Sequence, residues 1–293
     1  MTPLTVVIPT YNRCETLQKA VSAYLDQTAS QSIREILIVD DGSTDSTSEV
    51  VAAASRDSSV PIRYFRQSNK GPAAARNVGI REANGELILF TDDDIIPGSA
   101  FVTEHLEWHR RLPDSSTAVL GQVTWHPDVR PTPFMEWYGS DGALFGFSHL
   151  AGQTEVGYEY LYSCNLSLNT DFLRKHGTFD EDFKVAAYED SELGYRLGKA
   201  GMRLLYNPRA LAFHYQTLTF EDACRRARKC AVAEMVFKQK EAGIHYYSSH
   251  PLQKVSTLKT RVAKPFLWPL KRMMNRRIPL PWSIYRAVFR AFS

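Results

Sequence analysis

Three adjacent acidic residues, Asp92–Asp94, follow a short apolar run at residues 86–90 and are the strongest chemical feature of the sequence. Mg²⁺ and Mn²⁺ prefer hard oxygen ligands and commonly share them with substrate phosphates. A cation held there could neutralise a departing diphosphate as a Lewis acid. A solvated turn with one capping aspartate is the alternative, but it leaves the repulsion among three acids unexplained. We therefore predict a divalent-cation site.

A second acidic stretch, Asp40-Asp41-Gly42-Ser43-Thr44-Asp45, follows the apolar run at residues 35–39. Asp41 could accept a hydrogen bond from the base or ribose of a nucleotide. An Asx turn that caps a helix over residues 44–55, through Ser43 or Thr44, is the alternative. Both interpretations can hold, because different residues would serve them.

The segment Lys70-Gly71-Pro72 opens an alanine-rich stretch that is predicted to be a helix. Small residues allow close packing, and the free amides of a helix N-terminus favour phosphate. The segment does not match the GxxxxGK[ST] phosphate loop. A tightly packed helix that carries a basic surface residue therefore stays an equal alternative.

Two further candidates lie late in the chain. Glu189 and Asp190 begin a predicted helix over residues 189–200, and His214 ends the apolar run 210–213. Acids in a first turn complement the helix dipole, but Asp190 could also be a general base opposite a leaving group. His214 is either structural or a neutral imidazole ligand of the cation.

The elements that must position these residues follow from hydrophobic patterning. Continuously apolar runs rich in branched residues are typical of parallel strands buried on both faces, and helical stretches separate them. This alternation predicts a doubly wound, mostly parallel α/β sheet flanked by helices, with ligands at the carboxyl ends of its strands. The predicted strands are residues 4–8, 35–39, 62–66 and 86–90, and the predicted helices are residues 14–27, 44–55, 72–84, 189–200 and 219–241. Residues 126–157 are expected to form an irregular loop.

Taken in order, these motifs resemble glycosyltransferase family 2 over residues 3–215. The matching segments are Thr5–Arg13, Val39–Asp45, Gly71–Asn77, Asp92–Asp94 and Glu189–Asp190, and Cys164–Leu168 with Gly177–Glu181 resembles the acceptor-side segment of the family. The resemblance implies the GT-A fold and an inverting transfer from a nucleotide-diphosphate sugar to an acceptor hydroxyl, with Mg²⁺ or Mn²⁺ as cofactor. The chain lacks the QxxRW motif of processive synthases, which favours a single-addition enzyme.

The resemblance also implies a role for each matching residue. The base would be held by Pro9, Tyr11 and Asp41, the ribose or metal by Asp92 with Asp93 beside it, and the metal by Asp94 and His214; Asp190 would be the catalytic base, and Glu189 and Asn165 would lie on the acceptor side. The match is looser for Lys70 and Arg76, and only Lys70 is carried forward, as a diphosphate contact.

Two domains are predicted. Residues 1–215 form the catalytic domain, with a nucleotide-sugar half (1–98) and an acceptor half (99–215), and residues 216–293 form a helical, basic extension. From residue 242 to the end there are four Lys, six Arg and no acid. Ten cations and several aromatics in residues 254–293 favour an anionic membrane surface and a lipid-linked or surface-glycan acceptor. A tail that packs on the catalytic domain is the alternative.

Composition narrows the remaining classes. The chain has no run of about 18 apolar residues and no signal-peptide pattern, so we expect a cytoplasmic protein, peripheral at the inner face of the membrane if the tail binds lipid. The four scattered cysteines are expected to be reduced. No nucleic-acid module is recognised. Two rival functions remain: a sugar-nucleotide pyrophosphorylase, which should carry a Gly-rich basic signature after its first strand, and an inactive sugar-binding relative.

Overall fold

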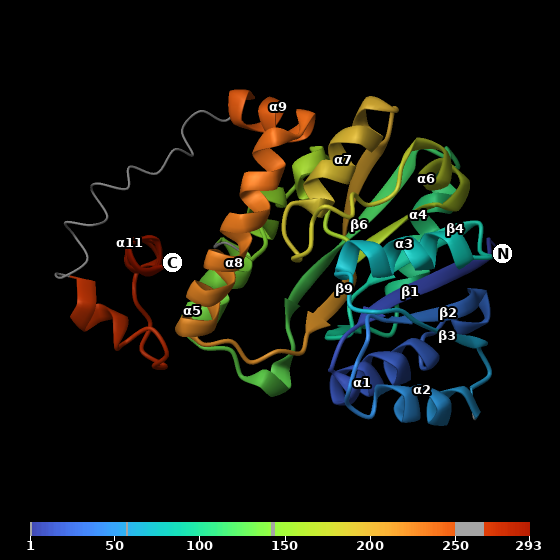
Figure 1. Ribbon diagram of the computed structural model, residues 1–293, viewed down its shortest axis with the longest axis horizontal. Helices are drawn as coiled ribbons and strands as arrows, with labels where there is room; N and C mark the ends of the chain where they lie inside the picture. The colour runs from blue at the N-terminus through green and yellow to red at the C-terminus, as the bar shows by residue number, and fades with distance from the viewer. Residues whose placement is uncertain (1, 57, 142–143, 250–266) are drawn as a thin grey trace. The chain divides into compact units, whose positions relative to one another are not determined.

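The computed structural model describes residues 2–56, 58–141, 144–249 and 267–293. The chain divides into two compact units. Unit 1 comprises residues 1–124 and 152–215, and unit 2 comprises residues 125–151 and 216–293. Chain colouring in Figure 1 lets both be followed by residue number. Residues 125–151, predicted to belong to the acceptor half, thus group with the C-terminal extension.

Unit 1 is built on a sheet whose first four strands are parallel. They are β1 (Leu4–Thr10), β2 (Ile33–Asp40), β3 (Ile62–Arg66) and β4 (Leu87–Thr91). Their order in the sheet is β3-β2-β1-β4, and Thr10 lies opposite Asp40 in the register. The acidic stretches that follow β2 and β4 therefore leave the sheet at the same edge as the end of β1. The predicted strands and the α/β class are confirmed.

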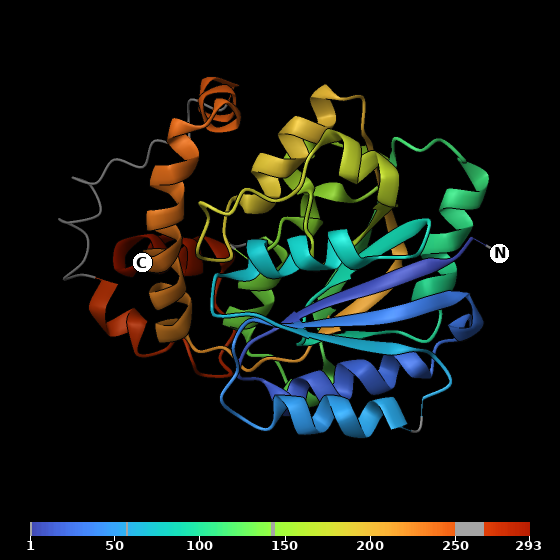
Figure 2. The same cartoon turned by 45° about the vertical axis from the view of Figure 1, so that its right-hand side comes forward.

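Helices cover both faces of this parallel part. They are α1 (Cys14–Leu25), α2 (Thr47–Arg56) and α3 (Pro72–Glu82). Figure 2 shows α1 and α2 together on one face of β1 to β3 and α3 on the other. Asp45 accepts a hydrogen bond from the Thr47 amide at 3.2 Å. The predicted cap on Ser43 or Thr44 is therefore wrong, because the helix begins three residues later than expected.

The rest of the sheet contains several antiparallel pairs. Strand β8 (Asn165–Asn169) runs antiparallel to β4, and β5 (Ile95–Pro97) runs antiparallel to β9 (Arg203–His214). The other elements of this part are β6 (Thr117–Trp125), β7 (Glu155–Val156), α4 (Phe101–Arg111), α6 (Thr170–His176), α7 (Glu189–Lys199), η1 (Ser30–Ser32) and η4 (Tyr158–Tyr160). The pairing of β5 with β9 places His214 next to the acidic triplet.

Unit 2 is helical. Its elements are α5 (Pro133–Ser140), α8 (Phe220–Gln239), α9 (Glu241–Ser249), α11 (Trp282–Phe292), η2 (Pro127–Val129) and η3 (Phe147–Leu150). Helix α5 corrects the prediction of an irregular loop over residues 126–157. Thr132 accepts a hydrogen bond from the Met135 amide and Pro133 occupies the first turn, a local start signal that the surrounding Pro and Gly residues obscured.

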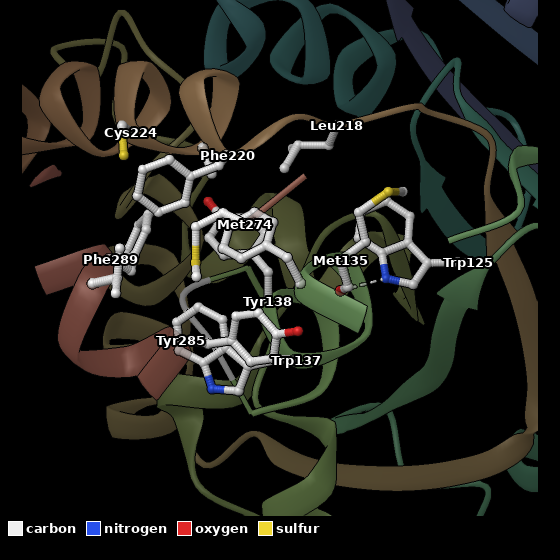
Figure 3. Close-up of a cluster of buried hydrophobic side chains, with 13 residues drawn as sticks. Trp125, Met135, Trp137, Tyr138, Leu218, Phe220, Cys224, Met274, Tyr285 and Phe289 are labelled. Carbon is white, nitrogen blue, oxygen red and sulfur yellow. Dashed lines mark hydrogen bonds between the residues drawn. The ribbon is translucent and has the colours of Figure 1, made fainter. Parts of the chain in front are cut away.

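An aromatic cluster holds unit 2 together. Figure 3 shows side chains from α5, α8 and α11 meeting in one buried group. Its members are Trp125, Phe134, Met135, Trp137, Tyr138, Leu218, Phe220, Ala223, Cys224, Met274, Tyr285, Val288 and Phe289. The apolar side of α11 is therefore buried within unit 2.

Two simple predictions can be checked against the described residues. None of their helices is long and apolar enough to cross a membrane. Their four cysteines, Cys14, Cys164, Cys224 and Cys230, are free thiols, as expected.

Candidate active site

Asp93 and Asp94, the second and third acids of the triplet, are both hydrogen-bonded to one arginine side chain. Arg13, just after β1, donates to Asp93 at 3.2 Å and also to Asp94. Thr10 donates its hydroxyl to Asp93 at 2.8 Å, and His214 Nε2 lies 3.2 Å from Asp94 Oδ2. The Tyr215 amide adds a hydrogen bond to the Asp94 carbonyl. The ends of β1, β4 and β9 therefore meet at this point.

These contacts separate the pKa values of the two neighbouring carboxylates. Burial and the charge of Asp94 raise the pKa of Asp93 to about 7. Burial acts in the same direction on Asp94, but His214 and Arg13 outweigh it and lower the pKa of Asp94 below its ordinary value. Asp94 is therefore the carboxylate that stays ionised, as a cation ligand must.

Arg76 connects the acidic triplet to α7. Its guanidinium donates to Asp92 at 2.7 Å and to Glu189 at 3.2 Å, and it lies over the ring of Phe179. Arg76 and Glu189 are both buried, while Asp92 is partly exposed. Burial and the nearby charge of Asp190 raise the pKa of Glu189 to about 7. One buried cation thus joins two acidic motifs that lie far apart in the sequence.

Asp190 lies in the first turn of α7, close to this bridge. Its Oδ2 accepts the Ser163 amide at 2.9 Å, whereas its buried Oδ1 has no hydrogen-bond partner among the described residues. Burial raises the pKa of Asp190, although Arg76 and the Ser163 amide act in the opposite direction. Tyr188, which precedes the helix, has a left-handed φ of 67°. Such backbone strain is common at functional sites.

Asp41 organises the loop before α3. Its carboxylate accepts hydrogen bonds from the Lys70 and Gly71 amides, each at 2.8 Å, and from Gln67 at 2.7 Å. Its own amide donates to the carbonyl of Thr10. Gly71 has φ 96°, a conformation that a Cβ would strain. Asp41 therefore lies at the same sheet edge as the triplet, but the protein itself uses both of its oxygens.

The remaining nucleotide candidates lie beside Asp41. Tyr11 is exposed at the end of β1, whereas Pro9 is buried within the strand. Lys70 is exposed just before α3. The side chain of Asn12, between β1 and α1, accepts the Thr44 amide at 2.7 Å, which fixes the two motif loops to each other. Tyr11 and Lys70 are thus accessible to a ligand.

Asn165 pairs with Thr91, next to the triplet, but its side chain is not accessible to a ligand. It is fully buried, and its amide nitrogen donates to the carbonyls of Gln122 and Ala210. Its oxygen lies 2.9 Å from a ring nitrogen of His105. All these contacts are within the protein, so the structure assigns Asn165 to support of the sheet. Its predicted place beside the acceptor is not carried further.

Two side chains of the site could bind a divalent metal ion. Among the described residues, no group of three or more His, Cys, Asp and Glu is placed to hold a metal ion. Asp94 and His214 nevertheless offer one oxygen and one nitrogen donor beside each other. Mg²⁺ and Mn²⁺ are commonly held by one or two protein ligands, with substrate phosphates and waters completing the shell. The two residues fit such a shared site.

The two arginines that organise the site, Arg13 and Arg76, were not predicted as site residues. The local signal for Arg76 was a single charge among the alanines of residues 73–75. A cation on a helix face that packs against a sheet must find a buried partner. The sequence could have raised this question, but it could not name Asp92 and Glu189 as the partners.

Comparison with known proteins agrees with this arrangement. The sequence profile of glycosyl transferase family 2 matches residues 5–143. Validoxylamine A glucosyltransferase of Streptomyces hygroscopicus subsp. jinggangensis is 32% identical over 222 residues, which cover 68% of this chain and 52% of the relative. Chondroitin synthase of Escherichia coli is 25% identical over 267 residues, covering 81% of this chain and 38% of the relative. The chain spans about half or less of the length of these relatives.

Solved structures show the same fold. Residues 1–349 of S. aureus TarS align with a TM-score of 0.61 at 17% identity, covering 99% of this chain and 91% of that one. A mannosyltransferase from Pyrobaculum calidifontis, in complex with GDP-Man and Mn²⁺, aligns with a TM-score of 0.61 at 15% identity and covers 98% of this chain and 86% of that one.

The fold is thus the GT-A fold of glycosyltransferases, as predicted. The sequence matches carry the assignment further: this chain belongs to glycosyltransferase family 2.

Proposed function

We propose that this protein transfers a sugar from a nucleotide-diphosphate sugar to an acceptor hydroxyl, with inversion at the anomeric carbon and Asp190 as the base. The observation that carries the proposal is the Arg76 bridge. It joins Asp92, in the triplet that would face the donor diphosphate, to Glu189, the neighbour of Asp190. Donor and acceptor groups would then be held at one fixed separation, as an in-line displacement requires.

Asp190 suits the role of base in two respects. Its buried Oδ1, which has no hydrogen-bond partner among the described residues, would accept the proton of the acceptor hydroxyl, while the bond from the Ser163 amide fixes the other oxygen. Its raised pKa makes it a stronger base than an exposed aspartate. Glu189 is buried and bonded to Arg76, so we propose that it positions the arginine. This role replaces the acceptor-shaping role predicted from the sequence.

Asp94 and His214 would hold Mg²⁺ or Mn²⁺. When bound, the cation would neutralise negative charge on the departing nucleoside diphosphate. Arg13, whose side chain is 42% exposed, forms an ion pair with Asp94. We propose that this ion pair breaks when Asp94 binds the metal ion. Arg13 could then contact the diphosphate itself. Tyr11 would face the nucleotide base and Lys70 the diphosphate, with Asp41 holding the loop that carries Lys70.

The substrate class is proposed only as far as the relatives suggest it. Their names include a glucosyltransferase, a chondroitin synthase and structures with UDP-GlcNAc or GDP-Man. We therefore propose a UDP- or GDP-linked hexose as donor and a glycan or lipid-linked acceptor.

The test begins with a thermal-shift screen of UDP- and GDP-sugars with Mn²⁺, followed by measurement of nucleoside diphosphate release. Asp190→Asn should lower turnover by about 10²–10⁴-fold, the usual contribution of a general base. It should leave the donor-induced thermal shift unchanged. Asp171→Asn, an exposed acid in the first turn of α6, is the matched control and should keep normal turnover.

Two results would contradict the proposal. Near-normal turnover of Asp190→Asn would remove Asp190 as the base. Release of inorganic diphosphate from a nucleoside triphosphate would instead support a pyrophosphorylase.

A further inference from the structure

The stretch that follows Met274 and includes the first two residues of α11 is unusually exposed and basic. This basic loop, residues 275–283, has the sequence Asn-Arg-Arg-Ile-Pro-Leu-Pro-Trp-Ser. All of its residues except Leu280 are exposed. Ile278 is 45% exposed and Trp282 is 46% exposed, which is high for large apolar side chains. Two arginines, an isoleucine and a tryptophan therefore face solvent within seven consecutive residues.

The basic loop is held at several points. The Tyr285 hydroxyl donates to the Ile278 carbonyl and accepts the Leu280 amide, each at 3.2 Å. At its start, Asn275 accepts the Phe220 amide at 2.7 Å. Tyr285 itself is buried in the aromatic cluster. The exposure of Ile278 and Trp282 is therefore imposed by an anchored backbone.

Positive charge predominates at the basic loop, although the Glu221 carboxylate accepts a hydrogen bond from Asn275 at its start. Residues 267–293 contain one Lys, five Arg and no acid. Lys271 and Arg286 pair with Glu221 and Asp141 elsewhere in unit 2. Within the described ranges, no carboxylate pairs with Arg276 or Arg277, and Arg277 donates only to a backbone carbonyl. An uncompensated positive surface beside exposed apolar side chains calls for an anionic partner.

The exposed side chains of the basic loop contrast with the buried ones further along α11. Within the segment 254–293 that was predicted to meet a membrane, Val288 and Phe289 of α11 are buried in unit 2. The apolar side of α11 packs against α5 and α8, so it is not the part of the segment that is exposed. Residues 254–266 of the predicted membrane segment lie outside the described residues. The exposed apolar groups are instead those of the basic loop and of Trp268, over which Arg272 stacks at 4.1 Å.

We propose that the basic loop binds an anionic lipid bilayer. Arg276 and Arg277 would lie at the anionic headgroups, and Ile278 and Trp282 would enter the interface between headgroups and acyl chains. Tryptophan favours that depth because its ring is amphipathic, and clustered arginines are attracted to the negative surface potential. Binding there would bring the enzyme to the membrane that carries the lipid-linked acceptor of the proposed function, on which this part of the inference rests. Vesicle binding needs neither donor nor acceptor, so either proposal can fail without the other.

The test is co-sedimentation of the full chain with two kinds of vesicle. One is phosphatidylcholine alone, and the other contains about 30% phosphatidylglycerol, which makes its surface anionic. We expect binding only to the anionic vesicles, weakening as salt screens the charges. The double variants Arg276→Glu/Arg277→Glu and Ile278→Ala/Trp282→Ala should each lower affinity at least about tenfold. Lipids brominated on their acyl chains should quench tryptophan fluorescence in the wild type, and less in Trp282→Phe.

Matched controls keep the result specific. Val232→Ala/Met235→Ala removes similarly exposed apolar side chains from α8 of the same unit. Arg56→Glu/Arg81→Glu makes the same charge change on exposed positions of unit 1. Both should bind like the wild type, and unchanged thermal unfolding confirms that each variant is folded. Equal losses in the controls, or binding to duplex DNA with none to anionic vesicles, would overturn the proposal.

Discussion

The active site of unit 1 and the aromatic cluster of unit 2 bury different kinds of side chain. At the active site, Arg76 and Glu189 are buried and Asp190 is partly buried, and one buried oxygen of each acid has no hydrogen-bond partner among the described residues. Unit 2 buries aromatic rings, with Phe134 stacked on Tyr138 and Trp137 stacked on Tyr285. Burying charge is costly unless every group is paired, whereas burying the carbon surface of aromatic rings is favourable and only the Tyr O–H and Trp N–H groups require partners.

This difference indicates what each region is for. Incompletely satisfied, coupled carboxylates with raised pKa values are typical of catalytic sites. The aromatic cluster carries no such chemistry, so its contribution is stability. Substitutions should therefore separate the two regions, and the predictions below run from the largest expected effect to the smallest.

The largest effect is expected from the aromatic cluster. Phe134 is fully buried, so Phe134→Ala leaves a cavity and should lower the free energy of unfolding of unit 2 by about 3–5 kcal/mol. Four of the five tryptophans lie in unit 2, so their fluorescence during urea unfolding reports this unit. An unchanged donor-induced thermal shift would support the separation. A loss of donor binding in a folded variant would contradict it.

Removing the buried guanidinium of Arg76 should lower the stability of unit 1 almost as strongly. Arg76→Met leaves Glu189 buried without its partner and should cost about 3 kcal/mol or more. Far-UV circular dichroism during unfolding measures the loss. Turnover should fall as well, because Asp92 and α7 are no longer joined. Arg174→Met is a useful comparison, since this arginine binds only backbone carbonyls of α3 and its vicinity and should leave turnover intact in folded protein.

Unit 1 also contains a pH-dependent element away from the site. Burial lowers the pKa of His109 to about 4, whereas an unfolded histidine titrates near about 6.5. The unfolded chain therefore binds the proton first, and stability is lost as the pH falls from about 6.5 towards 4. The loss should be about 1.4 kcal/mol per pH unit.

His109→Gln should remove that part of the pH dependence. The difference in unfolding free energy between the two proteins isolates it, because Glu189, whose raised pKa acts in the opposite direction, is common to both. Parallel curves between pH 6.5 and 4.5, a window of about two units set by these pKa values, would contradict this interpretation.

The smallest effect concerns a helix cap in unit 2. Thr219 and Asp222 form a reciprocal capping box at the start of α8. Thr219→Ala should cost about 1 kcal/mol in unit 2. Asp45→Ala, at the start of α2, is the corresponding change in unit 1. Fluorescence should report the first change and not the second. Equal fluorescence shifts would mean that the units do not unfold separately.

Much of unit 1 was predictable from its sequence. The apolar runs that form β1, β2 and β4 are buried on both faces. Their continuously apolar composition therefore predicts both that they are strands and that they lie inside a parallel sheet. The acidic stretches follow these runs, and parallel strands bring their carboxyl ends to one edge. The convergence of Asp92–Asp94 with Asp41 and His214 follows from that rule and the pairing of β5 with β9.

Other features depended on distant contacts. The sequence could not show that Arg76 bridges Asp92 and Glu189, because the bond to Glu189 spans 113 positions. It placed Asn165 at a ligand surface, whereas the packing of β8 buries it. The sequence also could not assign residues 125–151 to unit 2. The packing partners of their aromatic side chains lie on α8 and α11, far away in the chain.

The sequence by itself determined the parallel half of the sheet and the set of acids at its edge, because strand burial and strand direction are local consequences of composition and order. Only the tertiary structure decided which cations hold those acids and which aromatic side chains stay exposed. Both are outcomes of packing among segments far apart in the chain, where a side chain takes whichever partner or solvent the completed fold leaves beside it.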